Sequence, residues 1–124
     1  MNTSAASPPT HPVLLSEHEQ DGRHTLSLQL PLDLHYFEGH FPQLPVLPGL
    51  VQIAWALEFA SVRLDTPTHC RRMEMLKFQQ LLRPGDRIDL ILEYEAARNR
   101  LHFTYRRDGA DVSSGRMVWE GAHD

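Results

Sequence analysis

The chain has 124 residues and a mass of 14.2 kDa, with 41% hydrophobic and 23% charged residues, which suits one compact domain and leaves no room for a second. Its formal net charge of −4 excludes the basic excess of a nucleic-acid-binding protein, and no run of about 18 apolar residues could cross a bilayer. The single cysteine, Cys70, excludes a disulfide framework within the chain, and because the first residues lack a secretion signal we expect a cytoplasmic protein.

The N-terminal part predicts a short tail followed by a hairpin. Residues 1–10 are small, polar and proline-bearing, so we expect a flexible tail, with a single domain over residues 11–124. Within residues 12–32, two extended segments flank Asp21 and Gly22, and the second segment carries leucine at every other position. That alternation is typical of a half-buried strand. The alternating residues are Leu26, Leu28, Leu30 and Leu32.

A loop and a buried helix are expected next. Residues 33–49 contain three prolines and two glycines, so neither a helix nor a paired strand can run through them. Residues 50–62 are apolar on nearly every face, and Pro48 stands where the start of a helix tolerates proline. We therefore expect a helix that is buried on most of its sides.

The rest of the chain predicts a meander of strands. Residues 72–82 and 87–95 are expected to be strands joined by the turn Pro84-Gly85-Asp86, and alternation continues over residues 101–105 and 112–119. Further turns are expected at Arg98 and Asn99 and at Asp108 and Gly109. Antiparallel strands with one apolar helix predict an α+β domain in which a curved sheet wraps around the helix.

Two short motifs precede the expected helix. They are Gly39-His40-Phe41-Pro42 and Pro45-Val46-Leu47-Pro48-Gly49. With the helix that follows and the later turn Arg83-Pro84-Gly85-Asp86, they resemble the β-hydroxyacyl thioester dehydratases of the hot-dog superfamily. The resemblance implies a hot-dog fold, a homodimer, no cofactor, and substrates carried on the phosphopantetheine arm of an acyl carrier protein.

The resemblance also assigns roles to residues. Eliminating water requires a base for the α proton, a donor for the enolate-like oxygen and an acid for the departing hydroxyl. Histidine titrates at about pH 6.5 in water, which suits His40 as the base. Gly49 falls at the start of the helix, where free N–H groups could polarise the thioester carbonyl. The residues expected to line the substrate are Phe41, Pro48, Ala54 and Trp55.

The acid is the point of departure from the family pattern. The catalytic Glu or Asp of the family follows the histidine by fourteen residues, and that position is Ala54 here. Glu58 lies one turn further along the same helical face, about 5.4 Å away. We hypothesise that Glu58 replaces the acid, directly or through a water admitted by Ala54. The competing hypothesis is that the site has lost its acid and that Glu58 only orders structure, as in an ion pair with an arginine at a helix or subunit surface.

Gln52 points nearly opposite to Ala54, so we expect it to make a structural hydrogen bond. Trp55 and the G-H-F-P loop also resemble the dehydratases of aryl-polyene pathways, which act on carrier-bound aryl or polyene 3-hydroxyacyl chains. The leading function is therefore dehydration of 3-hydroxyacyl thioesters to trans-2-enoyl thioesters. Two alternatives stay open: a hot-dog thioesterase in which Glu58 activates water, and a non-catalytic protein that binds acyl chains or carrier proteins.

Two other clusters contain histidine, carboxylate or basic side chains. His35, Glu38 and His40 lack further ligands at the usual spacing, so we expect no metal site. Basic residues gather in the middle of the chain, and they could bind an acidic carrier protein or its phosphopantetheine arm, or else form a solvated strand face. These residues are Arg71, Arg72, Lys77, Arg83 and Arg87.

Overall fold

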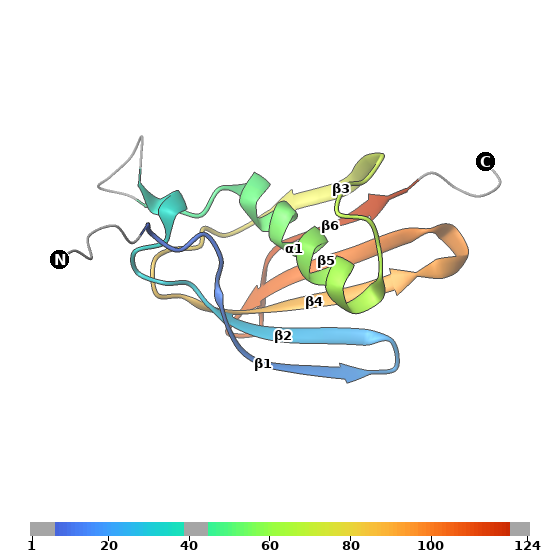
Figure 1. Cartoon of the computed structure of the whole chain (residues 1–124), viewed down its shortest axis with the longest axis horizontal. Coiled ribbons are helices and arrows are strands. Elements are labelled where there is room, and N and C mark those ends of the chain that lie inside the picture. Colours follow the sequence, from blue (N-terminus) through green and yellow to red (C-terminus); the bar gives the residue numbers. More distant parts are fainter. Residues whose placement is uncertain (1–6, 39–44, 120–124) are drawn as a thin grey trace.

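The structure is a computed structural model that describes residues 7–38 and 45–119. One antiparallel sheet of six strands packs against a single α-helix, α1 (Gly49–Leu64) (Figure 1). The predicted curved sheet with one central helix is confirmed. The predicted site residues His40 and Phe41 lie outside the described residues.

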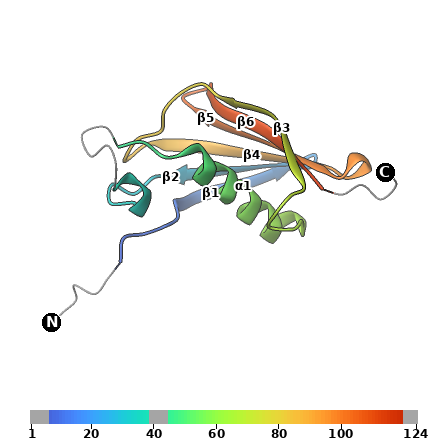
Figure 2. The same ribbon diagram turned by 90° about the horizontal axis from the view of Figure 1, so that it is seen from above.

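The sheet order differs from the chain order. From edge to edge the strands run β1 (Val13–Gln20), β2 (Arg23–Gln29), β4 (Arg87–Glu95), β5 (Arg100–Arg107), β6 (Ala110–Val118) and β3 (Arg72–Phe78). Between β2 and β3 the chain crosses one face of the sheet, and that crossing contains α1 (Figures 1 and 2). The candidate site lies on this crossing connection.

Two predicted hairpin turns are confirmed by their backbone angles. Asp21 and Gly22 have φ values of 54° and 80°, and Asp108 and Gly109 have 53° and 80°. Two-residue turns that match the twist of antiparallel strands require positive φ at both positions, which glycine and aspartate tolerate. The local sequence is therefore sufficient to form both turns.

The leucine alternation predicted the core face of β2, with one exception. Leu26, Leu28 and Leu30 are fully or almost fully buried, whereas Leu32 is 76% exposed. Leu30 still exchanges backbone hydrogen bonds with the turn before β4, and Pro31 follows it. Because the chain leaves the sheet there, the predicted burial of Leu32 is wrong.

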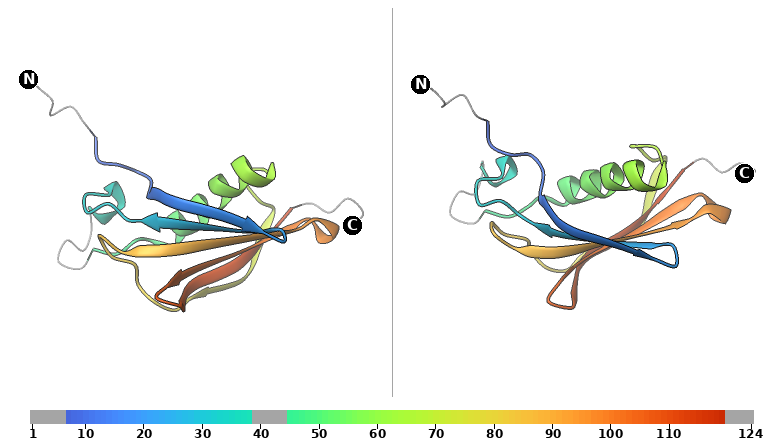
Figure 3. Two further views of the ribbon diagram at one scale, coloured as in Figure 1. Left: turned by 90° about the horizontal axis from the view of Figure 1, so that it is seen from below. Right: turned by 60° about the horizontal axis from the view of Figure 1, so that its bottom comes forward.

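One face of α1 is open, although its sequence is apolar nearly all round. Leu50 is 76% and Val62 is 81% exposed, and Ala54 and Glu58 are exposed between them. The curved sheet lies on one side of the helix and covers only the half that faces it (Figure 3). The expectation of burial on most sides is therefore wrong for this stripe.

Candidate functional site

The start of α1 is fixed by the proline-rich turn before it. The carbonyl oxygen of Pro48, the N-cap, accepts hydrogen bonds from the N–H groups of Val51 at 3.1 Å and Gln52 at 3.2 Å. The N–H groups of Gly49 and Leu50 precede the first bond of the helical ladder and point out of the helix end. These donors and the helix dipole stabilise negative charge, such as that on an enolate-like thioester oxygen.

A side chain at Gly49 would meet the ring of Phe78. A Cβ atom there would lie 2.8 and 2.9 Å from two ring carbons of Phe78, at the end of β3. Sequence reasoning identified Gly49 but missed Phe78, because the contact joins a loop to a strand far away in the sequence. The sheet edge thus brings an aromatic ring against the start of the helix.

Gln52 is the centre of a buried hydrogen-bond network. Its Nε2 donates to the carbonyl oxygen of Leu47 at 3.3 Å, and the hydroxyl of Ser113 donates to its Oε1 at 2.6 Å. The hydroxyl of Tyr105 donates to the backbone oxygen of Gln52 at 2.7 Å. The structural role expected for Gln52 is confirmed, and the network ties the first turn of α1 to β5 and β6.

We expect the Gln52→Leu variant to lose about 1–3 kcal/mol of unfolding free energy, because it leaves the buried hydroxyl of Ser113 without its acceptor. Urea unfolding followed by circular dichroism measures the change. The matched control is Gln79→Leu at an exposed glutamine, which should change stability by less than about 0.5 kcal/mol. Equal losses in the two variants would contradict the role of the network.

Ala54 and Glu58 share the open stripe of α1, as their spacing predicted. At 1.5 Å per residue, Ala54 lies about 7.5 Å and Glu58 about 13.5 Å from Gly49 along the helix axis. Side chains of a helix lean toward its N-terminus, so the carboxylate of Glu58 leans toward Ala54. A carboxylate on residue 58 must therefore reach further than one on residue 54 to contact a substrate bound at Gly49.

A histidine that sequence reasoning missed contacts Glu58. Nε2 of His11 lies 2.6 Å from Oε1 of Glu58, and its Nδ1 lies 2.9 Å from Oγ1 of Thr10. The His11 ring stacks on Trp55, with 6.5 Å between ring centroids and 25° between planes. No local pattern could reveal this pair, because 47 residues separate its members. Among the described residues of one chain, the side chain that contacts Glu58 is therefore a histidine.

Backbone contacts hold the segment that carries His11 against the domain. The carbonyl oxygen of Pro9 accepts a hydrogen bond from the N–H of His35 at 2.7 Å. The carbonyl oxygen of Thr10 accepts one from Nε1 of Trp55 at 3.2 Å. Trp55 is 2% exposed and belongs to the core, so its ring forms a firm base for His11.

The charge of Glu58 reaches the core beneath the helix. Burial raises the pKa of Tyr105 well above its usual value, and the negative charge of Glu58 raises it further. The phenol therefore stays neutral and keeps donating its hydrogen bond to Gln52. Glu58 is in this way electrostatically coupled to the network that holds the helix start.

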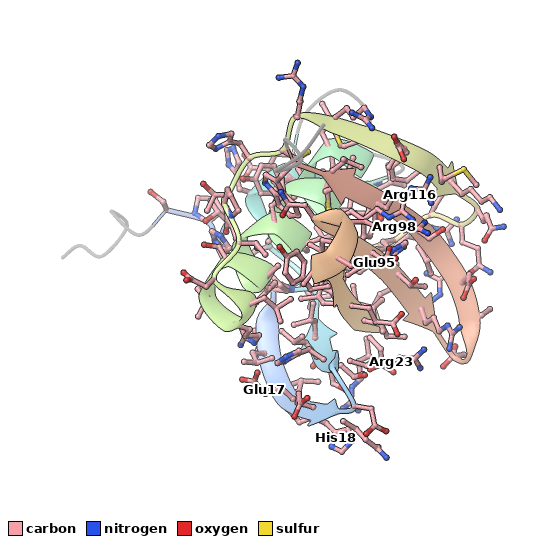
Figure 4. All side chains as sticks on the ribbon, turned by 90° about the vertical axis from the view of Figure 1, so that its right-hand side faces the viewer. Glu17, His18, Arg23, Glu95, Arg98 and Arg116 are labelled. Carbon is pink, nitrogen blue, oxygen red and sulfur yellow. The ribbon has the colours of Figure 1, made fainter. Side chains whose placement is uncertain are left out.

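The outer face of the sheet carries a cavity of about 650 Å³ whose lining includes Lys77, Glu95, His102 and Arg116. Its charges are largely paired: Glu95 lies 2.7 Å from Arg100, and Arg116 contacts Glu74 at the same distance. Figure 4 shows Glu95 and Arg116 on this part of the sheet, with Arg98 of the short helix η3 (Ala96–Arg98) near Glu95. Helix α1, which bears Gly49 and Glu58, packs against the opposite face, so we place the candidate site there.

The five basic residues singled out from the sequence do not form one patch. Arg72 and Lys77 lie on β3, whereas Arg87 begins β4, and β5 and β6 separate those strands in the sheet. Arg72 is also engaged with Glu74 at 2.7 Å.

Within residues 7–38 and 45–119, no group of three or more His, Cys, Asp or Glu side chains is arranged to hold a metal ion. The helices of this described part include none that is long and apolar enough to span a membrane.

Comparison with protein families and curated sequences gives consistent matches. The family model described as "ApeI-like: ApeI dehydratase" matches residues 16–116. The 3-hydroxyacyl-[acyl-carrier-protein] dehydratase FabZ of Sorangium cellulosum is 36% identical over 95 residues, which cover 67% of this chain and 61% of that protein. The FabZ of Chloroflexus aggregans is 34% identical over 51% of this chain and 49% of its own length. The chain thus spans between about half and two thirds of these curated relatives.

Solved structures show the same architecture. The dehydratase heterocomplex ApeI:P of Xenorhabdus doucetiae superposes with a TM-score of 0.80 at 30% identity, covering 87% of this chain and 96% of that chain. An uncharacterized protein of Erwinia carotovora subsp. atroseptica gives a TM-score of 0.74 at 31% identity, covering 92% and 99%. The dehydratase domain of MlnD from Bacillus amyloliquefaciens, at 16% identity, covers 92% of this chain and 45% of that chain with a TM-score of 0.63, and shows the fold alone. The predicted hot-dog fold is confirmed.

Proposed function

The chain belongs to the ApeI-like dehydratase family, whose model matches residues 16–116, and on this premise we propose that it removes water from 3-hydroxyacyl thioesters. The product is the trans-2-enoyl thioester, and the reaction is that of a hydro-lyase. The single observation that carries this function is the N-terminal end of α1. The N–H groups of Gly49 and Leu50 are free there, and the same helix bears Glu58 on its open face.

In the proposed reaction, His40 takes the α proton and the N–H of Gly49 stabilises the enolate-like oxygen. Glu58 serves as the acid in place of the carboxylate missing at residue 54. Because Glu58 lies one turn further from Gly49, a water between it and the departing hydroxyl completes the path beside Ala54. Phe41, Pro48 and Trp55 remain the residues proposed to surround the acyl chain.

The proposed substrate form is a 3-hydroxyacyl chain on an acyl carrier protein. The curated relatives that the chain resembles are named 3-hydroxyacyl-[acyl-carrier-protein] dehydratases, which supports this choice. The match to the ApeI-like family supports the aryl-polyene subgroup, so aryl and polyene chains are the substrates to test first. The protein is proposed to act without a cofactor and in the cytoplasm.

Intact-protein mass spectrometry tests this function. The wild-type protein is incubated with carrier proteins loaded with short, long and aryl 3-hydroxyacyl groups. Loss of one water, about 18 Da, from the loaded carrier protein is the expected result. Release of the free carrier protein would indicate the thioesterase alternative, and an unchanged mass on every substrate would favour the binding alternative.

We also propose a homodimer in which two β3 edges join and His40 of one protomer faces α1 of the other. The β3 edge and its continuation expose several large apolar side chains, which an isolated sheet edge rarely does. They are Met73, Met75, Leu76, Phe78 and Leu81.

Sedimentation velocity should show twice the chain mass for the wild type, and a Met75→Asp variant should shift toward monomer. A wild type that sediments as a monomer would contradict the homodimer and favour a heterocomplex, as described for the Xenorhabdus doucetiae relative.

A further inference from the structure

We propose that the acid of this site is a His11–Glu58 pair that holds one exchangeable proton, and not Glu58 alone. This inference rests on the proposed dehydratase function and adds to it a residue outside the family motifs. It assigns a catalytic purpose to the segment before β1.

The geometry of the pair leaves little choice about its hydrogen bonds. An ionised carboxylate only accepts, so the N–H on Nε2 of His11 donates to Oε1 of Glu58 across 2.6 Å. The other ring nitrogen lies 2.9 Å from the hydroxyl of Thr10, which can donate to a neutral ring or accept from a charged one. Both protonation states of His11 are therefore accommodated without moving the ring.

The ring of His11 is held in place on two sides. It stacks on Trp55, and the indole N–H of Trp55 donates to the carbonyl oxygen of Thr10. Trp55 is buried, so it gives the imidazole a fixed surface on which to stack, while the side chains of His11 and Glu58 themselves are 54% and 51% exposed.

The titratable residues near the pair either have other partners or stay neutral. Arg63, one turn further along α1, is engaged by both carboxylate oxygens of Glu17 at 2.7 and 3.0 Å. From the sheet, Tyr105 is the titratable group on which the charge of Glu58 acts, and it stays neutral. Among the described residues, His11 is the basic side chain that contacts Glu58.

A histidine in this position solves a problem of proton supply. Glutamate side chains titrate at about pH 4.3 in water and histidine at about pH 6.5. A carboxyl group alone has therefore lost its proton under conditions in which an imidazole still holds an exchangeable one. Nε2 of His11 thus gives the carboxyl group of Glu58 a second site at which an exchangeable proton can reside.

The proton balance closes over one turnover. The α C–H bond breaks and its proton goes to His40, while the electron pair forms the C=C bond and expels the hydroxyl. The hydroxyl takes one proton from the pair, through the water beside Ala54, and leaves as water. His40 then returns its proton to solvent, and the pair regains one from solvent.

The test compares His11→Gln and His11→Ala with the wild type and with His18→Gln. Glutamine keeps a side-chain donor for Glu58 but cannot hold an exchangeable proton, so it separates proton supply from simple positioning. His18 is an exposed histidine near the tip of the β1–β2 hairpin and serves as the matched control (Figure 4). The assay is the mass-spectrometric loss of water, with kcat and KM measured across pH.

We expect both His11 variants to lose about 10- to 100-fold in kcat with little change in KM, whereas His18→Gln keeps the wild-type rate. Wild-type kcat in His11→Gln would overturn the proposal, because a side chain that only donates a hydrogen bond to Glu58 would then be sufficient.

A second measurement does not depend on turnover. The NMR chemical shifts of the His11 ring should change in Glu58→Gln and stay as in the wild type in Glu93→Gln, because Nε2 of His11 lies 2.6 Å from Oε1 of Glu58. Unchanged His11 signals in Glu58→Gln would overturn the pair. If the wild type and His11→Gln dehydrate equally well, the role of His11 is refuted and the dehydratase function stands. If the wild type dehydrates none of the substrates, the proposed function itself is refuted.

Discussion

His40→Ala is expected to lose about 10²- to 10⁴-fold in the rate of water loss from a carrier-bound 3-hydroxyacyl chain. The reason is chemical: alanine cannot accept the α proton, and no C=C bond forms until that proton has left. Intact-protein mass spectrometry of the loaded carrier protein measures the rate directly.

The matched control is His35→Ala, a second histidine in the connection that leads to α1. Its ring is exposed and contacts Tyr36 at the edge, so its removal should leave the rate within about twofold. If His40→Ala retained most of its activity while Glu58→Ala lost it, the thioesterase alternative would replace dehydration. In that reaction Glu58 activates water and His40 is dispensable.

The second large effect is expected at Glu58. Glu58→Gln keeps the size of the side chain but cannot exchange the proton that the departing hydroxyl needs, so the rate should fall about 10²- to 10⁴-fold. Glu93→Gln provides the control, since Glu93 is an exposed carboxylate that pairs with Arg23 at 3.2 Å. The same mass-spectrometric assay applies to both variants.

Residue 54 separates a relocated acid from a lost one. If Glu58 has taken over the role, Ala54→Glu gives no gain in the wild-type background, and in Glu58→Gln it restores part of the rate. If the site has decayed, the wild type is inactive and Ala54→Glu alone creates activity. A fully active Glu58→Gln variant would contradict the assignment of Glu58 as the acid.

Local patterns predicted much of the architecture. The Asp21-Gly22 and Asp108-Gly109 turns need only residues that tolerate positive φ, and both have it. Alternation predicted the strand over residues 87–95 with the observed bounds of β4. The helix expected over residues 50–62 extends by one residue at its start and two at its end, as α1. These turns and element bounds depend on residues that are neighbours in the sequence, so they can be predicted from the sequence alone.

Leu32 and the open face of α1 show where local patterns fail. Leu32 continues the alternation of β2 but lies beyond the point at which the chain leaves the sheet, so it is exposed. The apolar stripe of α1 predicts burial, but a single sheet can cover only one side of a helix. What covers the other side is decided by the assembly, for which we propose a second copy of the chain.

The sequence by itself determined the family motifs, the turns, the alternating strands and the alanine at the expected acid position, because each is written in a few consecutive residues. Only the tertiary structure decided that Phe78 fills the space beside Gly49 and that His11 reaches Glu58. Each contact joins α1 to a segment at an edge of the sheet. Phe78 ends β3 at one edge, and His11 precedes β1 at the other edge. Their spacing along the chain contains no periodic signal, since such contacts are set by packing across the fold and not by neighbouring residues.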